Sequence, residues 1–269
     1  MTRSVLHLLA STAFLLLSTL SMASASSLRN LALPGPQPGP YPAVLLLHGC
    51  SGMENNIPMW QDFLRSKGYA SAAVESFQKR GFSEICTDFG RVPMSARIDD
   101  VYQGLAELAA RSDIDPKRIA VMGFSNGGGA VFSSLTSLVA SRLPPGHARF
   151  RAGVALYPDC SLFAPTAFAV PLATFIGRDD DWTPAAACEK LASKVPADRP
   201  AFEVTVYPGA HHSFDMPDLA NHYLGRVRNM HKANGMGATV AGNWKVLQLA
   251  KRDVEEYLAR ALQPAIDSK

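Results

Sequence analysis

Six short runs of apolar residues recur along the chain, and none alternates with polar residues. They cover residues 43–48, 70–74, 119–122, 153–157, 172–176 and 204–207. A strand with one face in solvent alternates apolar and polar residues, whereas a strand of a parallel sheet is covered on both faces and is apolar throughout. The runs therefore predict a parallel sheet buried between two layers of helices.

Helical patterns separate these runs. Apolar side chains repeat at three- and four-residue steps in residues 95–111, and again in a final helix that contains Leu247, Ala250, Val254 and Leu258. Shorter helices are predicted at residues 60–67, 127–140 and 184–193. Strand and helix alternation in 269 residues predicts one doubly wound α/β domain. No element is predicted for residues 215–243, which are rich in Gly, Asn and His.

The first residues are typical of a secretory signal peptide. Arg3 supplies a positive charge, residues 5–20 are largely apolar, and Ala23, Ser24 and Ala25 form a small-residue cleavage site. We expect a signal peptide at 1–25, a Pro/Gly-rich linker at 26–42 and the α/β domain at 43–269. The mature protein should be secreted or periplasmic, with no membrane contact after cleavage.

Export affects how the four cysteines are interpreted. In an oxidising compartment they favour two disulfides over thiol chemistry, and their spacing matches no zinc motif. Four cysteines allow three pairings. We favour the sequential one, Cys50 with Cys86 and Cys160 with Cys188, with each bridge stabilising the fold by about 3 to 4 kcal/mol in the chain-entropy model.

Charge and motif content exclude several classes of partner. The formal net charge is +3 and no basic run occurs, so the sequence gives no basis for nucleic-acid binding. His211, His212 and the run of three aspartates at 179–181 do not have the spacing of a common metal site. We therefore predict no metal and no cofactor, and make no prediction of oligomeric state.

The strongest chemical signal is the sequence Gly123-Phe124-Ser125-Asn126-Gly127, which lies between a predicted strand and a predicted helix. A GxSxG pattern in that context indicates a nucleophile elbow, in which a sharp turn presents the serine and no Cβ fits at the flanking positions. Ser125 is therefore the predicted nucleophile. The alternative is a glycine-rich helix start that contacts only its own sheet.

A serine hydroxyl needs a base and a carboxylate that orients that base. In α/β-hydrolases these follow the serine in the order acid, then histidine, each after a strand. Residues 177–184 (GRDDDWTP) follow one predicted strand, and residues 208–215 (PGAHHSFD) follow the next. The residues alone leave the acid open among the three aspartates at 179–181.

Together, four motifs resemble the dienelactone hydrolase family of α/β-hydrolases: HGCSG (48–52), GFSNGGG (123–129), GxxDxxxP (177–184) and HxF (212–214). The resemblance implies an α/β-hydrolase fold, Asp180 as the acid and His212 as the base. It also implies attack on an ester or lactone carbonyl. The namesake enzymes are cytoplasmic and have Cys at the elbow, so Ser125 and the export signal set this chain apart.

The remaining site predictions concern the oxyanion and the substrate. Backbone N–H groups of Asn126 and Cys50 are expected to form the oxyanion hole, because one follows the nucleophile and the other lies in the loop after the first predicted parallel strand. Arg80, Tyr157 and Trp182 lie at or near strand ends, where a doubly wound sheet binds its ligand. We therefore predict that they contact the substrate.

The sequence predicts a serine hydrolase that cleaves carboxylic esters or lactones of small substrates through an acyl-enzyme. No large lid insertion is evident, which favours small or soluble substrates. A non-catalytic binding protein of the same fold is the alternative from another class. A peptidase or an acyltransferase with the same triad also remains open.

Overall fold

The computed structural model describes the chain except for residues 1–27, 36–38, 164–167, 197 and 265–269. The predicted signal peptide and its cleavage site lie outside the described residues. Seven strands form one sheet in the order β1-β3-β2-β4-β5-β6-β7, and β8 and β9 form a separate two-stranded sheet. Within the described part of the chain, no helix has the length and apolar character needed to cross a membrane.

All six apolar runs form strands of the large sheet, and neighbouring members of this set run parallel. The strands are β1 (Leu28–Ala32), β2 (Tyr41–Leu47), β3 (Ala70–Val74), β4 (Ile114–Phe124), β5 (Ala152–Leu156), β6 (Leu172–Gly177), β7 (Phe202–Tyr207), β8 (His222–Arg228) and β9 (Met236–Val240). The helices are α1 (Asn56–Ser66), α2 (Met94–Ala109), α3 (Asn126–Ser134), α4 (Ser137–Ala140), α5 (Ala185–Ala192) and α6 (Trp244–Ala261).

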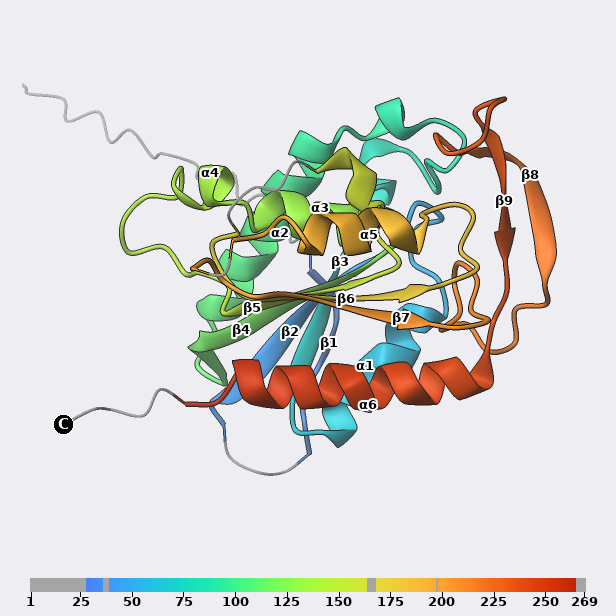
Figure 1. Ribbon diagram of the computed structural model, residues 1–269. Helices are drawn as coiled ribbons and strands as arrows, with labels where there is room; N and C mark the ends of the chain where they lie inside the picture. The colour runs from blue at the N-terminus through green and yellow to red at the C-terminus, as the bar shows by residue number, and fades with distance from the viewer. Residues whose placement is uncertain (1–27, 36–38, 164–167, 197, 265–269) are drawn as a thin grey trace, which may run out of the picture.

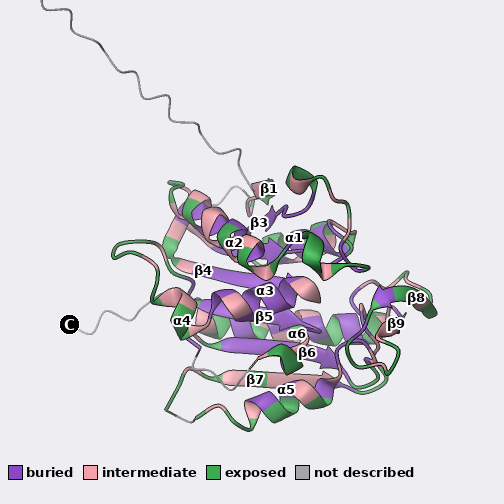
Figure 2. Ribbon diagram, turned by 90° about the horizontal axis from the view of Figure 1, so that it is seen from above, coloured by how far each residue is buried: buried purple, intermediate pink, exposed green. Residues whose placement is uncertain are grey.

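Helices cover both faces of the sheet. Figure 1 shows α1 and α6 on one face and α2, α3 and α5 on the other. The central strands are buried along their length, as Figure 2 shows, and every residue of β3, β5 and β6 is buried. This burial explains why their sequences show no alternation. The fold is therefore the predicted mostly parallel α/β sheet.

The N-terminal boundary of the domain differs from the prediction. Part of the expected linker at 26–42 is strand β1, which pairs antiparallel with β3 at the sheet edge, and β2 begins at Tyr41. The three central residues of β1 are exposed. An edge strand with so little burial has no apolar run, so no strand was predicted there.

Residues 215–243, for which no element was predicted, contain the β8–β9 hairpin. The hairpin lies at the end of the sheet where β6 and β7 finish (Figure 1). Most of β8 is exposed, whereas Ala238 and Val240 of β9 are buried in a small apolar cluster with Cys50, Cys86 and Trp182. The hairpin is therefore packed against the loops that follow the parallel strands.

Candidate active site

Ser125 lies on a sharp turn between β4 and α3. Its backbone has φ 53° and ψ −119°, a left-handed conformation that is strained for a residue with a Cβ. A Cβ on Gly123 would lie 2.3 Å from the carbonyl oxygen of Gly127, and one on Gly127 would lie 2.2 Å from that of Leu47. Both glycines are therefore required for this turn, as expected of a nucleophile elbow.

The turn brings Ser125 next to His212, which follows β7. The Ser125 hydroxyl donates to Nε2 of His212 at 2.9 Å, and Nδ1 of His212 donates to Oδ2 of Asp180 at 2.8 Å. His212 and Asp180 are both buried. The hydroxyl, imidazole and carboxylate thus form a continuous hydrogen-bonded line from three different strand ends.

Both carboxylate oxygens of Asp180 accept hydrogen bonds from neighbouring residues. The backbone N–H groups of Trp182 and Thr183 donate to Oδ1 at 2.9 and 2.8 Å. The Thr183 hydroxyl lies 2.8 Å from Oδ2 and 3.1 Å from Nδ1 of His212. Thr183 was not predicted as a site residue, although it lies three residues after the predicted acid in the sequence. These donors hold the carboxylate in place beside the imidazole.

The neighbours of this carboxylate have other contacts. Asp181 accepts from the N–H of Thr239 at 2.7 Å and pairs with Lys232 at 2.8 Å, so it fastens the β8–β9 hairpin. Asp179 is exposed, and its carbonyl oxygen accepts from Nδ1 of His211 at 2.9 Å. Among the described residues, no group of three or more His, Cys, Asp and Glu side chains could hold a metal ion.

Aromatic rings lie on two sides of His212. The rings of Tyr157 and Trp182 have centroids 4.7 and 4.8 Å from the imidazole. Trp182 lines a cavity beside Ser125. Tyr157 is buried behind the imidazole and is not among the cavity-lining residues. In the structure its ring therefore packs against the histidine, and its predicted contact with substrate stays a prediction.

The Tyr157 hydroxyl contacts a second buried carboxylate, Asp215. It donates to Oδ1 at 2.6 Å, while Trp60 Nε1 and Asn56 Nδ2 reach Oδ2 at 2.9 and 3.3 Å. Burial raises the pKa of Asp215. Three donors from α1 and the end of β5 thus anchor the loop that carries the histidine.

The loop after β2 packs directly against the elbow. A Cβ on Gly49 would lie 3.6 Å from the Ser125 Cβ, and Cys50 follows immediately. Asn126 opens α3, so its backbone N–H has no acceptor within that helix. Asn126 thus follows the serine directly, and Cys50 follows the glycine that packs against it.

Arg97, which the sequence did not single out, connects these two segments. It is fully buried in α2, where it donates to the Asn126 side-chain oxygen and, at 2.8 Å, to the carbonyl oxygen of His48. Its guanidinium lies 5.1 Å from the ring centre of Phe77, and burial lowers its pKa to about 10. In sequence, it looks like any arginine of an amphipathic helix.

Arg80 does not reach the cavity. It forms a two-pronged pair with Asp100 at 2.7 and 3.0 Å and donates to the Ser76 carbonyl oxygen at 2.6 Å. The partner carboxylate lies on α2, and the sequence could not show that this helix packs against the loop carrying Arg80. In the structure Arg80 thus joins its own loop to α2, and the predicted contact with substrate stays a prediction.

Two disulfides connect the loops around the site. Cys50 is bonded to Cys86, and Cys160 to Cys188, which is the sequential pairing favoured from the sequence. The first bridge joins the loop after β2 to the segment whose Cys86 carbonyl oxygen accepts from the N–H of Arg228, at 2.9 Å. It thereby couples the loop beside Ser125 to the β8–β9 hairpin.

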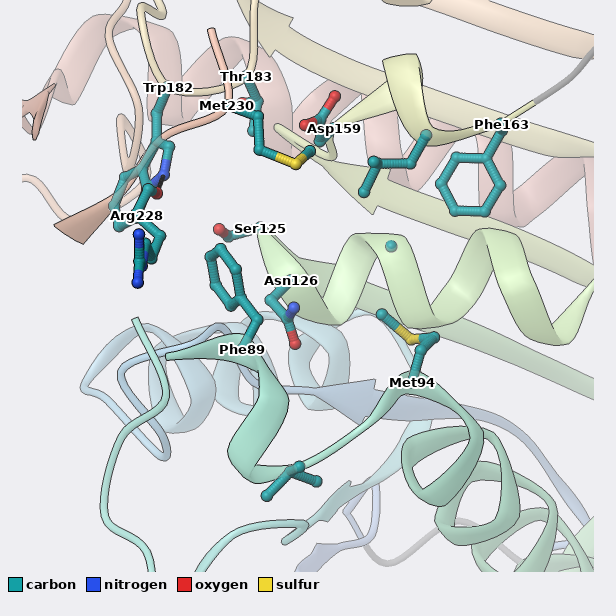
Figure 3. A pocket seen from close by; sticks show the side chains of 13 residues that line it. Phe89, Met94, Ser125, Asn126, Asp159, Phe163, Trp182, Thr183, Arg228 and Met230 are labelled. Atoms are coloured by element: carbon teal, nitrogen blue, oxygen red, sulfur yellow. Dashed lines mark hydrogen bonds between the residues drawn. The ribbon is translucent and has the colours of Figure 1, made fainter. Parts of the chain in front are cut away.

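A cavity of about 280 Å³ opens beside Ser125 (Figure 3). Its walls come from loops that are distant in sequence, including the hairpin. They are lined by Phe89, Val92, Met94, Ser125, Asn126, Gly129, Asp159, Leu162, Phe163, Trp182, Thr183, Arg228 and Met230. The hydroxyl of Ser125 is thus accessible from a largely apolar cavity.

Comparisons with known proteins agree with this architecture. Dienelactone hydrolase from Anabaena variabilis ATCC 29413 has a TM-score of 0.61 at 17% identity, covering 87% of this chain and 91% of that one. The Thermogutta terrifontis esterase Est2, in a structure with propionate bound, has a TM-score of 0.60 at 16% identity, covering 87% and 90%. At such identities these matches show a shared fold.

Sequence relatives align over smaller parts of the chain than these solved structures do. An uncharacterized 31.7 kDa protein of the Escherichia coli traX-finO intergenic region is 30% identical over 95 residues, 35% of this chain and 32% of that protein. The chain thus spans about a third of the length of the first curated relatives it matches. The model of the dienelactone hydrolase family matches residues 30–234. Because that match covers most of the chain, the protein belongs to the dienelactone hydrolase family.

Proposed function

We propose that the protein is a serine hydrolase that cleaves carboxylic ester or lactone bonds of small substrates. The observation that carries this proposal is the hydrogen-bonded line Ser125–His212–Asp180, at 2.9 and 2.8 Å, beside a cavity. Family membership supports the same reaction class, and the name of the esterase Est2 shows that this fold accommodates ester cleavage.

In the first half-reaction Ser125 Oγ attacks the substrate carbonyl carbon as its proton moves to Nε2 of His212. The carboxylate of Asp180 holds the Nδ1–H tautomer and stabilises the imidazolium that forms. His212 then returns the proton to the leaving oxygen, the carbon–oxygen bond breaks, and an acyl-enzyme remains on Ser125. Water activated by His212 completes hydrolysis.

The negative oxygen of the tetrahedral intermediate needs donors already in place. Backbone N–H groups of Asn126 and Cys50 fill this role, and each such donor contributes roughly 10²- to 10³-fold in rate. The Cys50–Cys86 bridge and Arg97 support the two segments that carry these donors. Their position is therefore fixed before substrate arrives.

Two disulfides suit an exported protein, because cytosolic thiols are kept reduced. With the predicted signal peptide at 1–25, they support a secreted or periplasmic location. A thiol titration under denaturing conditions, on protein purified from its native host, tests whether the four cysteines are oxidised. Absence of free thiols agrees with export, and four free thiols contradict it.

Turnover of p-nitrophenyl acetate by the purified protein and by Ser125→Ala tests the proposed reaction. The variant should keep its fold by circular dichroism and lose at least 10³-fold in kcat. Unchanged turnover in Ser125→Ala would rule out the serine mechanism. Absence of ester turnover in the unaltered protein would favour a non-catalytic binding protein.

A further inference from the structure

An apolar slot leads away from Ser125 along the first turns of α3. Gly129 lies one turn after the nucleophile, with its N–H bonded to the Ser125 carbonyl oxygen at 3.0 Å, and contributes no side chain to the cavity wall. Met94 lies over this position, 3.6 Å from where a Gly129 Cβ would stand. Farther on, the Phe163 ring is 5.0 Å from that of Phe132 in α3. The slot is thus bounded by the Met94 thioether and the Phe163 ring, which packs on Phe132.

The other side of Ser125 has a different character. Trp182 lies beside His212 and donates through Nε1 to the carbonyl oxygen of Arg228 at 2.7 Å. Arg228 itself is exposed. Figure 3 shows Ser125 between this pair and the apolar residues Met94 and Phe163. A substrate bound at the serine therefore extends in two chemically distinct directions.

The chemistry of the proposed function decides which part of the substrate takes each direction. His212 must reach the leaving oxygen to protonate it, within about 2.6–3.2 Å. The alcohol part therefore lies on the side of His212 and its neighbour Trp182, where it can leave to solvent. The acyl part stays bonded to Ser125 and lies on the opposite side, in the slot along α3.

The size of the cavity limits what the slot accepts. An apolar protein cavity of about 150 Å³ is large enough to bind benzene, and the whole cavity here, with the sides of Trp182 and of α3 together, measures about 280 Å³. About half of that volume would accommodate an aryl ring close to the ester carbon. An acetyl group would leave most of the apolar wall in contact with water, at a cost in binding.

We propose, on the basis of the proposed function, that the preferred substrates are esters with an aryl-bearing acyl group such as phenylacetyl. The charged residues on the wall do not oppose this group. Asp159 is paired with His231 at 3.1 Å and bonded to Ser161, and Arg228 lies on the alcohol side. The acyl group therefore meets apolar surface along the slot.

The test compares kcat/KM for ethyl acetate, ethyl phenylacetate and benzyl acetate, each followed by acid release in a pH-stat. Ethyl phenylacetate should exceed ethyl acetate by roughly 10- to 100-fold, because an aryl group in an apolar pocket adds discrimination of this order. Benzyl acetate, whose ring is on the alcohol, should gain much less. An equal or larger gain for benzyl acetate would overturn the assignment of the slot.

Gly129→Leu fills the slot and should bring the ratio of phenylacetate to acetate close to one. Gly129→Ala is the milder second variant, since its Cβ has room at 3.6 Å from Met94, and it should lower the ratio several-fold. Leu138→Ala, at an exposed position on α4, is the control and should leave the ratio unchanged.

The results separate the two proposals. Hydrolysis of ethyl acetate without a preference for phenylacetate keeps the serine hydrolase and overturns the aryl-acyl assignment. An unchanged ratio in folded Gly129→Leu and Gly129→Ala also overturns it. Absence of turnover on all three esters contradicts the proposed function itself.

Discussion

His212 and His48 are both buried imidazoles near the carboxyl ends of parallel strands, and both donate a hydrogen bond through Nδ1. The acceptor is the Asp180 carboxylate for His212 and the Gly49 carbonyl oxygen, at 2.8 Å, for His48. Nε2 of His212 faces the Ser125 hydroxyl, whereas Nε2 of His48 accepts from a backbone N–H at 3.2 Å.

These partners give the two rings different chemistry. The Ser76 N–H cannot give up its proton to Nε2 of His48, and burial together with the charge of Arg97 lowers the pKa of His48 to about 3. His48 is therefore a neutral structural ring. His212 has a carboxylate on one side and an exchangeable hydroxyl proton on the other, so it can take and return a proton. Because both rings are buried, their hydrogen-bond partners, and not their burial, make His212 a base and His48 a structural residue.

The largest expected effect comes from His212→Gln. Loss of the base should reduce kcat on p-nitrophenyl acetate by roughly 10⁴- to 10⁶-fold, because removal of a triad histidine has effects of this size. Stopped assays with high enzyme concentration measure the residual rate. A loss below tenfold in the folded variant would place the base elsewhere and remove the contrast with His48.

Asp180→Asn should reduce kcat by about 10⁴-fold, because an amide holds the histidine in the wrong tautomer. The matched control is Asp179→Asn, at an exposed neighbour in the same loop, which should keep activity within twofold. If Asp179→Asn and Asp180→Asn lose activity equally, the assignment of the acid is contradicted.

His48 should affect stability instead of chemistry, and with a defined pH dependence. Its pKa is about 3 in the folded protein against 6.5 as a free side chain, so the unfolded chain binds the extra proton between these values. Stability from neutral His48 is full above pH 6.5 and falls as the pH drops toward 3. The slope is at most about 1.4 kcal/mol per pH unit.

Urea unfolding between pH 4 and 6.5 measures this slope in the unaltered protein and in His48→Gln. The glutamine variant should be less stable at pH 6.5 and should show a shallower pH dependence. Parallel curves for the two proteins would contradict the neutral structural role of His48.

The smallest expected effect concerns Arg97, which joins the His48 carbonyl oxygen to Asn126. Arg97→Lys keeps the charge and loses the fork that reaches both partners. We expect kcat on p-nitrophenyl acetate to fall roughly tenfold, with little change in KM, because an oxyanion donor segment loses support. A change confined to KM would contradict this role.

The sequence anticipated the parts of this molecule that repeat a physical pattern. Each buried strand of the parallel sheet is a continuous apolar run, and the elbow needs glycine on both sides of Ser125 for steric reasons. The order of nucleophile, acid and base pointed to two loops. The choice of Asp180 within residues 179–181 rested on the family resemblance, and the structure places that carboxylate beside His212.

The sequence did not anticipate features that depend on tertiary contact alone. Strands β1 and β8 are largely exposed, so their residues show no apolar run. No local pattern shows that Arg80 pairs with Asp100 or that Arg97 is buried under the elbow. Only the packing of α2 against the sheet and its loops distinguishes them.

Covalent labelling of Ser125 tests the central claim most directly. The purified protein is exposed to a fluorophosphonate and its intact mass and peptides are measured, alongside Ser125→Ala and His212→Gln. The account predicts one adduct, located on Ser125, absent in the alanine variant and formed far more slowly in the glutamine variant. An adduct on another residue, or none in the unaltered protein, would contradict a serine nucleophile activated by His212.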